Sequence, residues 1–211
     1  MTTAARDLLH VALDVGAGRP PEQGDLSLAL AGAELLDLLD AGAVRLENDL
    51  VVPADRPTVT DPLLDQAASV LVRRTPYESV DDWLWRRGRG LAAAYLAALG
   101  ADGQLVEQRR HRAPFTTGRP VAADTPEHRA AVDRRTAREP VLTALAAAVS
   151  IAGTPTDAPP DAPPDAPPDI TDDAVATVLT AVNDAVRELD AVRQRRAVED
   201  AAFDNIWRGA I

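Results

Sequence analysis

The clearest hydrophobic pattern in the chain lies between residues 27 and 41 and predicts a helix. Leucines recur there at the three- and four-residue spacing of one helical face. Asp25 is the expected N-terminal cap, and Gly42 stands where a helix end needs a residue that adopts a left-handed conformation. We expect the opposite face of this helix to meet solvent, because three acidic residues share it: Glu34, Asp37 and Asp40.

Two short β-hairpins are predicted, each directly after a helix. Val44 and Leu46 alternate with Arg45 before a polar turn at residues 47–49, and an apolar run follows at residues 50–52 until Pro53 ends the second strand. The same order of helix, glycine and strand returns at residues 91–108, so a second hairpin should begin at Gln104 and return before Pro120. A weak internal repeat is one interpretation of this recurrence. Two unrelated hairpins are the other, and we favour it.

The remaining hydrophobic patterns predict further helices. They cover residues 61–74, 79–87, 91–99, 125–138 and 140–153 and a last long helix from about 171. Thr60 or Asp61 is the expected cap of the first of these helices, and Ser79 that of the second. Residues 4–15 carry apolar residues at mixed spacing, which fits a helix or a buried strand, and we favour the strand. The sequence therefore predicts a mainly α single domain, with a central helical bundle, surrounding amphipathic helices and short β-hairpins.

A proline- and aspartate-rich segment interrupts this pattern before the last helix. Residues 157–169 repeat the unit DAPP, which offers no large apolar side chain for a core and favours an extended conformation. We interpret residues 154–169 as a linker inserted into a single domain that spans residues 1–211.

Composition and charge exclude several classes of protein. The 211 residues are 46% apolar and include no cysteine, which rules out disulfides, thiolate nucleophiles and cysteine-based metal sites. The net charge of −11 opposes nonspecific binding to nucleic acid, although residues 107–138 contain more arginine than acidic residues. No apolar run is long enough to cross a bilayer, so we expect an unprocessed cytoplasmic protein.

The sequence contains no catalytic constellation. His10, His111 and His128 lack the spacing of metal ligands, and the serines lie outside the context of a nucleophile elbow. His10, in an apolar run, is expected to be a core residue with its hydrogen bonds satisfied. We therefore expect no enzymatic activity, no cofactor and no metal.

Two clusters are candidates for binding an anionic partner. The first combines aromatic rings with guanidinium groups, a pairing that suits phosphate headgroups or acidic protein surfaces: Trp83, Trp85, Arg86, Arg87 and Arg89. The alternative for this cluster, which we favour, is a tryptophan anchored in the core with solvated arginines nearby. The second cluster is the tip of the second hairpin, which is equally well interpreted as an ordinary exposed loop: Arg109, Arg110, Arg112, Phe115 and Arg119.

The order of several segments resembles the Golgi phosphoprotein 3 family, in a bacterial, actinobacterial-type form. The matching segments are residues 28–46, 59–71, 79–87, 95–105, 118–132 and 140–150. The resemblance implies a helical domain that binds membranes peripherally, recognises a phosphatidylinositol phosphate and self-associates. For this chain it implies a non-enzymatic adaptor, here at the inner face of the membrane, whose partners are anionic lipid headgroups or an acidic protein.

The positions that read the inositide in this family differ here. They fall on Glu22, Ala31, Arg89 and Ala92, and only Arg89 keeps the residue type that the family uses. The sequence thus predicts the family's fold without its inositide pocket. An alternative function, a winged-helix-like DNA-binding regulator, rests on the two hairpins and is disfavoured by Glu47 and Asp49 at the tip of the first.

Overall fold

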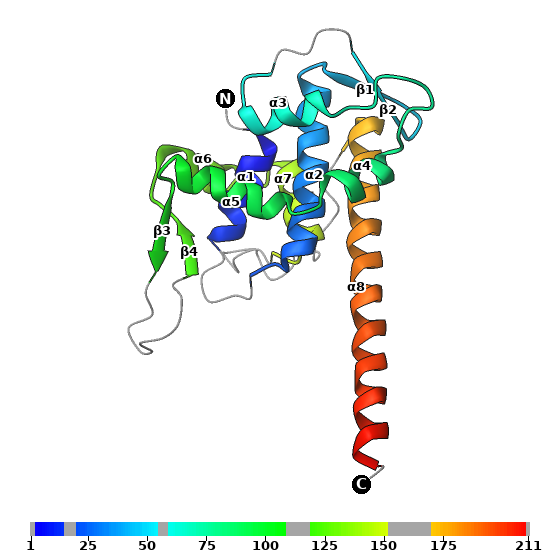
Figure 1. Ribbon diagram of the computed structural model, residues 1–211. Helices are drawn as coiled ribbons and strands as arrows, with labels where there is room; N and C mark the ends of the chain where they lie inside the picture. Colours follow the sequence, from blue (N-terminus) through cyan, green and yellow to red (C-terminus); the bar gives the residue numbers. More distant parts are fainter. Residues whose placement is uncertain (1–2, 15–19, 55–58, 109–118, 152–169, 210–211) are drawn as a thin grey trace, which may run out of the picture.

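The computed structural model describes residues 3–14, 20–54, 59–108, 119–151 and 170–209 (Figure 1). The predicted linker at 154–169 lies outside these ranges. The described part is mainly α-helical with two separate antiparallel strand pairs, which confirms the predicted fold class.

Helix α2 (Gln23–Asp40) is the centre of the fold. It packs against α1 (Ala4–Leu13), α3 (Pro62–Ser69), α4 (Val80–Arg87), α5 (Leu91–Ala101), α7 (Pro140–Ala148) and α8 (Asp173–Gly209), whereas α6 (Pro126–Thr136) packs against α1 and α7. Because helices surround it, α2 is buried on nearly every side. The polar face that the sequence predicted for α2 is wrong at Glu34, whose side chain is fully buried.

The segment that we expected to be a strand is helix α1. Thr3 caps it by accepting a hydrogen bond from the Arg6 amide at 3.3 Å. Apolar residues of α1 are buried on several sides at once, so its pattern lacks the single stripe of a surface helix. The Asp37 carboxylate of α2 accepts hydrogen bonds from the free amides of Ala4 at 2.8 Å and Ala5 at 3.2 Å, which fixes the start of α1 against α2.

Both predicted hairpins are present. Strand β1 (Val44–Glu47) pairs with β2 (Leu50–Pro53), and Asn48 at their turn has a φ of 58°. Gly42 ends α2 with a φ of 63°, as predicted. Strand β3 (Leu105–Gln108) pairs with β4 (Arg119–Ala122).

Several helix boundaries differ from the expectation. Asp61, one of the two candidate caps, caps α3, and Ser79 caps α4 as predicted, but α3 ends at Ser69, five residues early. The N-cap of α2 is Glu22 rather than Asp25. Asp25 lies in the first turn instead and forms an ion pair with Arg193 of α8 at 2.7 Å.

Helix α8 crosses α2 at two glycines and then leaves the body. A Cβ atom at Gly32 would lie 2.3 Å from Cγ2 of Val182, and one at Gly24 would lie 2.9 Å from Cδ2 of Leu189. The absence of side chains at these two positions lets the backbones approach closely. Beyond Arg193 every side chain that is described is exposed, and the helix runs on past the other elements (Figure 1).

Candidate functional site

Trp83 lies in the core. Its side chain is fully buried, and its indole Nε1 donates a hydrogen bond to the Ala31 carbonyl of α2 at 3.0 Å. A buried indole with its only donor satisfied has nothing left to offer a surface ligand. The structure thus corrects the hypothesis that Trp83 contacts a ligand and favours the alternative, in which Trp83 anchors α4.

The Arg86 guanidinium lies over the ring of Trp83. The distance from the guanidinium carbon to the centre of that ring is 5.2 Å. The guanidinium also donates bidentate hydrogen bonds to the buried Glu78 carboxylate, the shortest at 2.6 Å. The side chain remains 40% exposed. Arg86 therefore keeps one face available while Glu78 and Trp83 fix its orientation.

Arg87 is part of a buried polar network. Its Nε and Nη2 donate to the two Glu34 oxygens at 2.7 and 2.8 Å, and the Tyr95 hydroxyl donates to the same carboxylate at 3.1 Å. Burial lowers the pKa of Arg87, but the hydrogen bonds and charge of Glu34 outweigh this effect, so the net pKa is raised and the guanidinium stays charged. Arg87 is therefore occupied within the fold, and the sequence-based hypothesis that it binds a ligand is corrected.

Burial also perturbs the other two members of this network. Burial raises the pKa of Glu34, and the hydrogen bonds from Arg87 and Tyr95 offset only part of that rise. Burial and the nearby Glu34 charge raise the pKa of Tyr95 above its usual range. The hydroxyl therefore remains protonated and available to donate to Glu34. No sequence pattern marked Glu34 as part of a site, because its partners come from distant segments.

Trp85, near the end of α4, and Arg89, in the turn between α4 and α5, both reach the surface. Trp85 is partly buried against the core, and Arg89 is exposed and forms no ion pair with any described residue. Two glycines, Gly88 and Gly90, constrain the backbone of this turn on either side of Arg89. A Cβ atom at Gly88 would lie 3.3 Å from the Ser27 carbonyl, and Gly90 adopts a φ of 70°.

The second candidate cluster is only partly described. Arg109, Arg110, Arg112 and Phe115 lie outside the described residues. Arg119 begins β4 opposite Gln108, but its side chain lies outside the description as well. At the base of this hairpin, the Val106 side chain is 51% exposed.

The four positions that correspond to the inositide-reading residues do not form one exposed pocket. Ala31 and Ala92 are fully buried, and the Ala92 amide donates to the Ser27 hydroxyl at 3.1 Å. Glu22 caps α2, whereas Arg89 lies on the turn before α5. Only Arg89 combines an exposed position with a positive charge.

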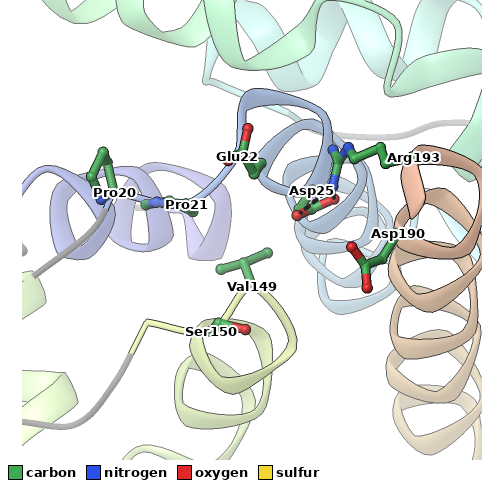
Figure 2. A pocket seen from close by; sticks show the side chains of 8 residues that line it. All are labelled: Pro20, Pro21, Glu22, Asp25, Val149, Ser150, Asp190 and Arg193. Carbon is green, nitrogen blue, oxygen red and sulfur yellow. Dashed lines mark hydrogen bonds and ion pairs between the residues drawn. The ribbon is translucent and has the colours of Figure 1, made fainter. Parts of the chain in front are cut away.

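A hollow of about 430 Å³ lies at the start of α2 (Figure 2). Its rim carries three acidic residues, Glu22, Asp25 and Asp190, and Arg193 is held by Asp25 across it. Pro20 and Pro21 and the end of α7, Val149 and Ser150, complete the lining. The acidic rim disfavours an anionic ligand at this place.

His10 lies in an incompletely satisfied polar cluster. It is fully buried, and its ring lies 5.6 Å from that of His128. Among the described residues, neither His10 nitrogen finds a hydrogen-bond partner, and none is found for the Gln104 Oε1 or the His128 Nδ1. The expected core position is confirmed, but the expected satisfaction of its hydrogen bonds is wrong.

Within the described residues, no three histidine, cysteine or acidic side chains group as metal ligands. No helix in that part of the chain is long and apolar enough to cross a membrane. The first hairpin carries the exposed Glu47, paired with Arg45 at 2.7 Å, at the position where a DNA-binding wing would approach phosphates.

Comparison with known proteins supports the resemblance inferred from the sequence. No curated protein matches the chain. A family profile described as Golgi phosphoprotein 3 (GPP34) matches residues 4–205, which cover all the helices packed around α2 and both hairpins. The chain therefore belongs to the Golgi phosphoprotein 3 family.

Proposed function

We propose that this protein is a non-enzymatic adaptor that binds anionic lipid headgroups through the turn between α4 and α5. The observation that carries the proposal is Arg89, which is exposed and unpaired among the described residues on a turn that the fold holds rigidly. Arg86 adds a second, partly exposed guanidinium whose direction Glu78 fixes. Side chains that are ordered before binding lose less conformational entropy when they meet a ligand.

Trp85 supports a membrane as the source of the anionic groups. It is a partly exposed indole in the same helix as Arg86, and tryptophan favours the interface between water and lipid. The binding surface proposed here therefore consists of Trp85, Arg86 and Arg89. Such a protein would lie at the cytoplasmic face of a membrane, where anionic lipids attract basic residues by about 1 kcal/mol each.

The buried alanines argue against selective recognition of a phosphoinositide. Ala31 and Ala92 have no room for side chains that would close around a headgroup. We therefore propose binding that depends on the surface charge of the membrane and not on the identity of the headgroup. Few cationic contacts and a net charge of −11 imply that this binding is weak and sensitive to salt.

Vesicle flotation tests the proposal. The wild-type chain is expected to float with vesicles that contain phosphatidylserine or phosphatidylinositol 4-phosphate and to stay behind with pure phosphatidylcholine. The double variant Arg86→Ala and Arg89→Ala should lose most of this binding. Arg187→Ala is the matched control, because it removes an 81% exposed arginine from α8.

Two outcomes would contradict the proposal. One is flotation that is absent at low salt, and the other is flotation that the double variant leaves unchanged. If vesicles fail but the same two arginines are needed to bind an acidic protein, that protein is the partner instead. Arg87 stays unaltered in these variants, because its loss would disturb the fold. Arg89→Ala is also tested alone, because Arg86→Ala leaves the buried Glu78 carboxylate without its guanidinium partner, and the single variant should still weaken flotation.

A further inference from the structure

The polar cluster around His10 contains four buried atoms without a hydrogen-bond partner among the described residues. They are both ring nitrogens of His10, the Nδ1 of His128 and the Oε1 of Gln104. Buried polar atoms in native proteins are nearly always satisfied by protein groups, by water or by a bound ion. Nitrogen and oxygen atoms that converge in this way are able to bind a ligand that prefers such donors.

Three separate elements bring the cluster together. His10 lies in α1, His128 in the first turn of α6, and Gln104 between α5 and β3. The backbone of Gln104 is held on both sides, because its amide donates to the Leu99 carbonyl and its carbonyl accepts from the Ala123 amide, both at 2.8 Å. Burial lowers the pKa of His10 and the Gln104 side chain partly raises it again, so these two groups face each other.

The two imidazole rings have nearly the separation of two ligands on one metal ion. Their centres are 5.6 Å apart, and their planes are tilted by 51°. Two imidazoles that bind one Zn²⁺ at about 2.0–2.1 Å in tetrahedral geometry place their ring centres about 5 Å apart. Small side-chain shifts are therefore enough for both rings to reach the same ion.

The types of donor indicate which class of ion the cluster suits. Imidazole nitrogens bind zinc and related divalent transition metals well, whereas Mg²⁺ and Ca²⁺ prefer sites made of oxygen. The third donor is the amide oxygen of Gln104. A cluster with two imidazoles and one amide oxygen therefore favours an ion of the zinc class.

Asp14 provides the surroundings that a metal-binding histidine requires. Its carboxylate lies 3.8 Å from the Nε2 of His128, whereas the unpaired atom of the same ring is Nδ1. A carboxylate beside the second nitrogen orients such a histidine and makes it a stronger ligand. The Asp14 side chain is 51% exposed, so an ion can enter from this side of the cluster.

The nearest arginine does not make the cluster strongly positive. Arg6 lies one helical turn before His10 in α1. Its guanidinium pairs with Asp61 at 2.6 Å and with Asp102 at 3.0 Å, so its charge is compensated. The charge of Glu127 also favours a cation at His10.

We propose that His10, His128 and Gln104 bind a divalent transition metal ion of the zinc class, with solvent as the remaining ligand. The ion joins α1, α6 and the start of the second hairpin. Sequence spacing does not reveal this site, because the two histidines come from opposite halves of the chain. The site is separate from the proposed lipid-binding surface on the α4–α5 turn.

Titration of the full, untagged chain with Zn²⁺ tests the proposal. Isothermal titration calorimetry at pH 7.5 should show one Zn²⁺ bound per chain, and Mg²⁺ at the same concentrations should not bind to the cluster. His10→Leu and His128→Leu should each weaken Zn²⁺ binding by about tenfold or more, since each removes one of the two nitrogen ligands. His111→Ala is the matched control, because His111 is the third histidine of the chain and its loss should leave binding unchanged.

Nitrogen NMR of the imidazole rings gives a second result that needs no change to the cluster. One equivalent of Zn²⁺ should shift the ring signals of two of the three histidines. The His111→Ala variant identifies the third set of signals, which should stay in place.

Three outcomes would overturn the proposal. These are a chain that does not bind Zn²⁺, binding that either His10→Leu or His128→Leu leaves unchanged, and binding that His111→Ala abolishes. Circular dichroism shows whether each variant is folded. If a variant is unfolded, the imidazole signals of the wild-type chain decide, and Zn²⁺ that shifts neither His10 nor His128 contradicts the site.

Discussion

Arg87 of α4 and Glu34 of α2 form a bidentate ion pair inside the protein, in which the Glu34 side chain is fully buried and that of Arg87 is only 11% exposed. The pair links the surface of the proposed membrane-binding turn to the central helix. Because Arg86 and Arg89 lie within two residues of Arg87, this buried pair anchors the backbone that carries them. It is a structural contact that positions the proposed site.

Breaking this pair on one side should be costly. Arg87→Met leaves the Glu34 carboxylate buried with the Tyr95 hydroxyl as its remaining side-chain partner, so we expect the free energy of unfolding to fall by about 3–5 kcal/mol. The double variant Glu34→Leu and Arg87→Met removes both charges and should lose clearly less. Urea denaturation measures both.

The control for this experiment is an exposed ion pair. Arg45 and Glu47 of β1 are 62% and 54% exposed, and Arg45→Met should cost less than about 1 kcal/mol. A similar loss in Arg87→Met and Arg45→Met would show that the buried pair contributes no more than a surface pair.

Gly32 should be intolerant of any side chain. A Cβ atom would lie 2.3 Å from Cγ2 of Val182, so Gly32→Ala must displace α8 from α2 and should cost about 1–3 kcal/mol. Gly100 of α5 provides the matched control, because a Cβ atom there meets only Leu105, at 3.8 Å. Gly100→Ala should leave stability unchanged or raise it by about 0.4–1 kcal/mol. Equal melting temperatures for the two variants would contradict the close approach of α8.

The sequence predicts the helices and hairpins well where one local signal suffices. Gly42 ends α2 and Ser79 begins α4 through interactions within a few residues, and both are recognisable in the sequence. Burial of polar residues is different. Glu34 is separated by 53 residues from Arg87, so the pattern of α2 alone suggested a solvated carboxylate.

The same reasoning explains the errors at the candidate site. Alternating tryptophans and arginines are compatible with a core anchor, the interpretation that we favour, and with a binding surface, because the sequence does not show which face of α4 meets α2. The structure divides the cluster by residue: Trp83 and Arg87 point inward, whereas Arg89 remains exposed. The pattern of α1 favours a strand because a helix buried on several sides has no single apolar stripe.

His10 should make the fold sensitive to acid. Burial, followed by the charges of His128 and Arg6, lowers the pKa of His10 from its ordinary value of 6.5, although Gln104 and Glu127 partly oppose this shift. As the pH falls through about 6.5, His10 therefore binds a proton in the unfolded chain but stays neutral in the folded protein. The stability that His10 contributes is present above this pH and is lost as the pH falls below it.

The variant His10→Leu tests this expectation. Its stability relative to the wild type should improve as the pH falls from 7.5 to about 5, because leucine does not bind a proton in either the folded or the unfolded chain. Urea midpoints across this range measure the difference. A difference that does not change with pH would mean that folded His10 titrates as in the unfolded chain.

Asp37 should have the opposite pH dependence. Burial raises the pKa of Asp37 from 3.8 to about 7, although the Ala4 and Ala5 amides partly lower it, and nearby Asp7 and Glu34 add to the rise. The folded protein then holds a proton that the unfolded chain has released, so the stability from this group is complete below about pH 4 and is lost as the pH rises through 7. The loss amounts to at most about 4 kcal/mol.

Asp37→Asn separates this charge effect from the hydrogen bonds. Asparagine keeps one acceptor oxygen for the start of α1, so the variant should be less stable than the wild type by about 1–2 kcal/mol at pH 4.5. As the pH rises to 8, the wild type ionises its buried carboxylate and the variant does not, so the difference should shrink and change sign. Asp40→Asn makes the same change at an exposed position of α2 and is the control for replacing a surface carboxylate by an amide. If Asp37→Asn is instead most harmful at pH 8, the two amides stabilise the ionised carboxylate more than burial opposes it, and Asp37 caps α1 as a charged group.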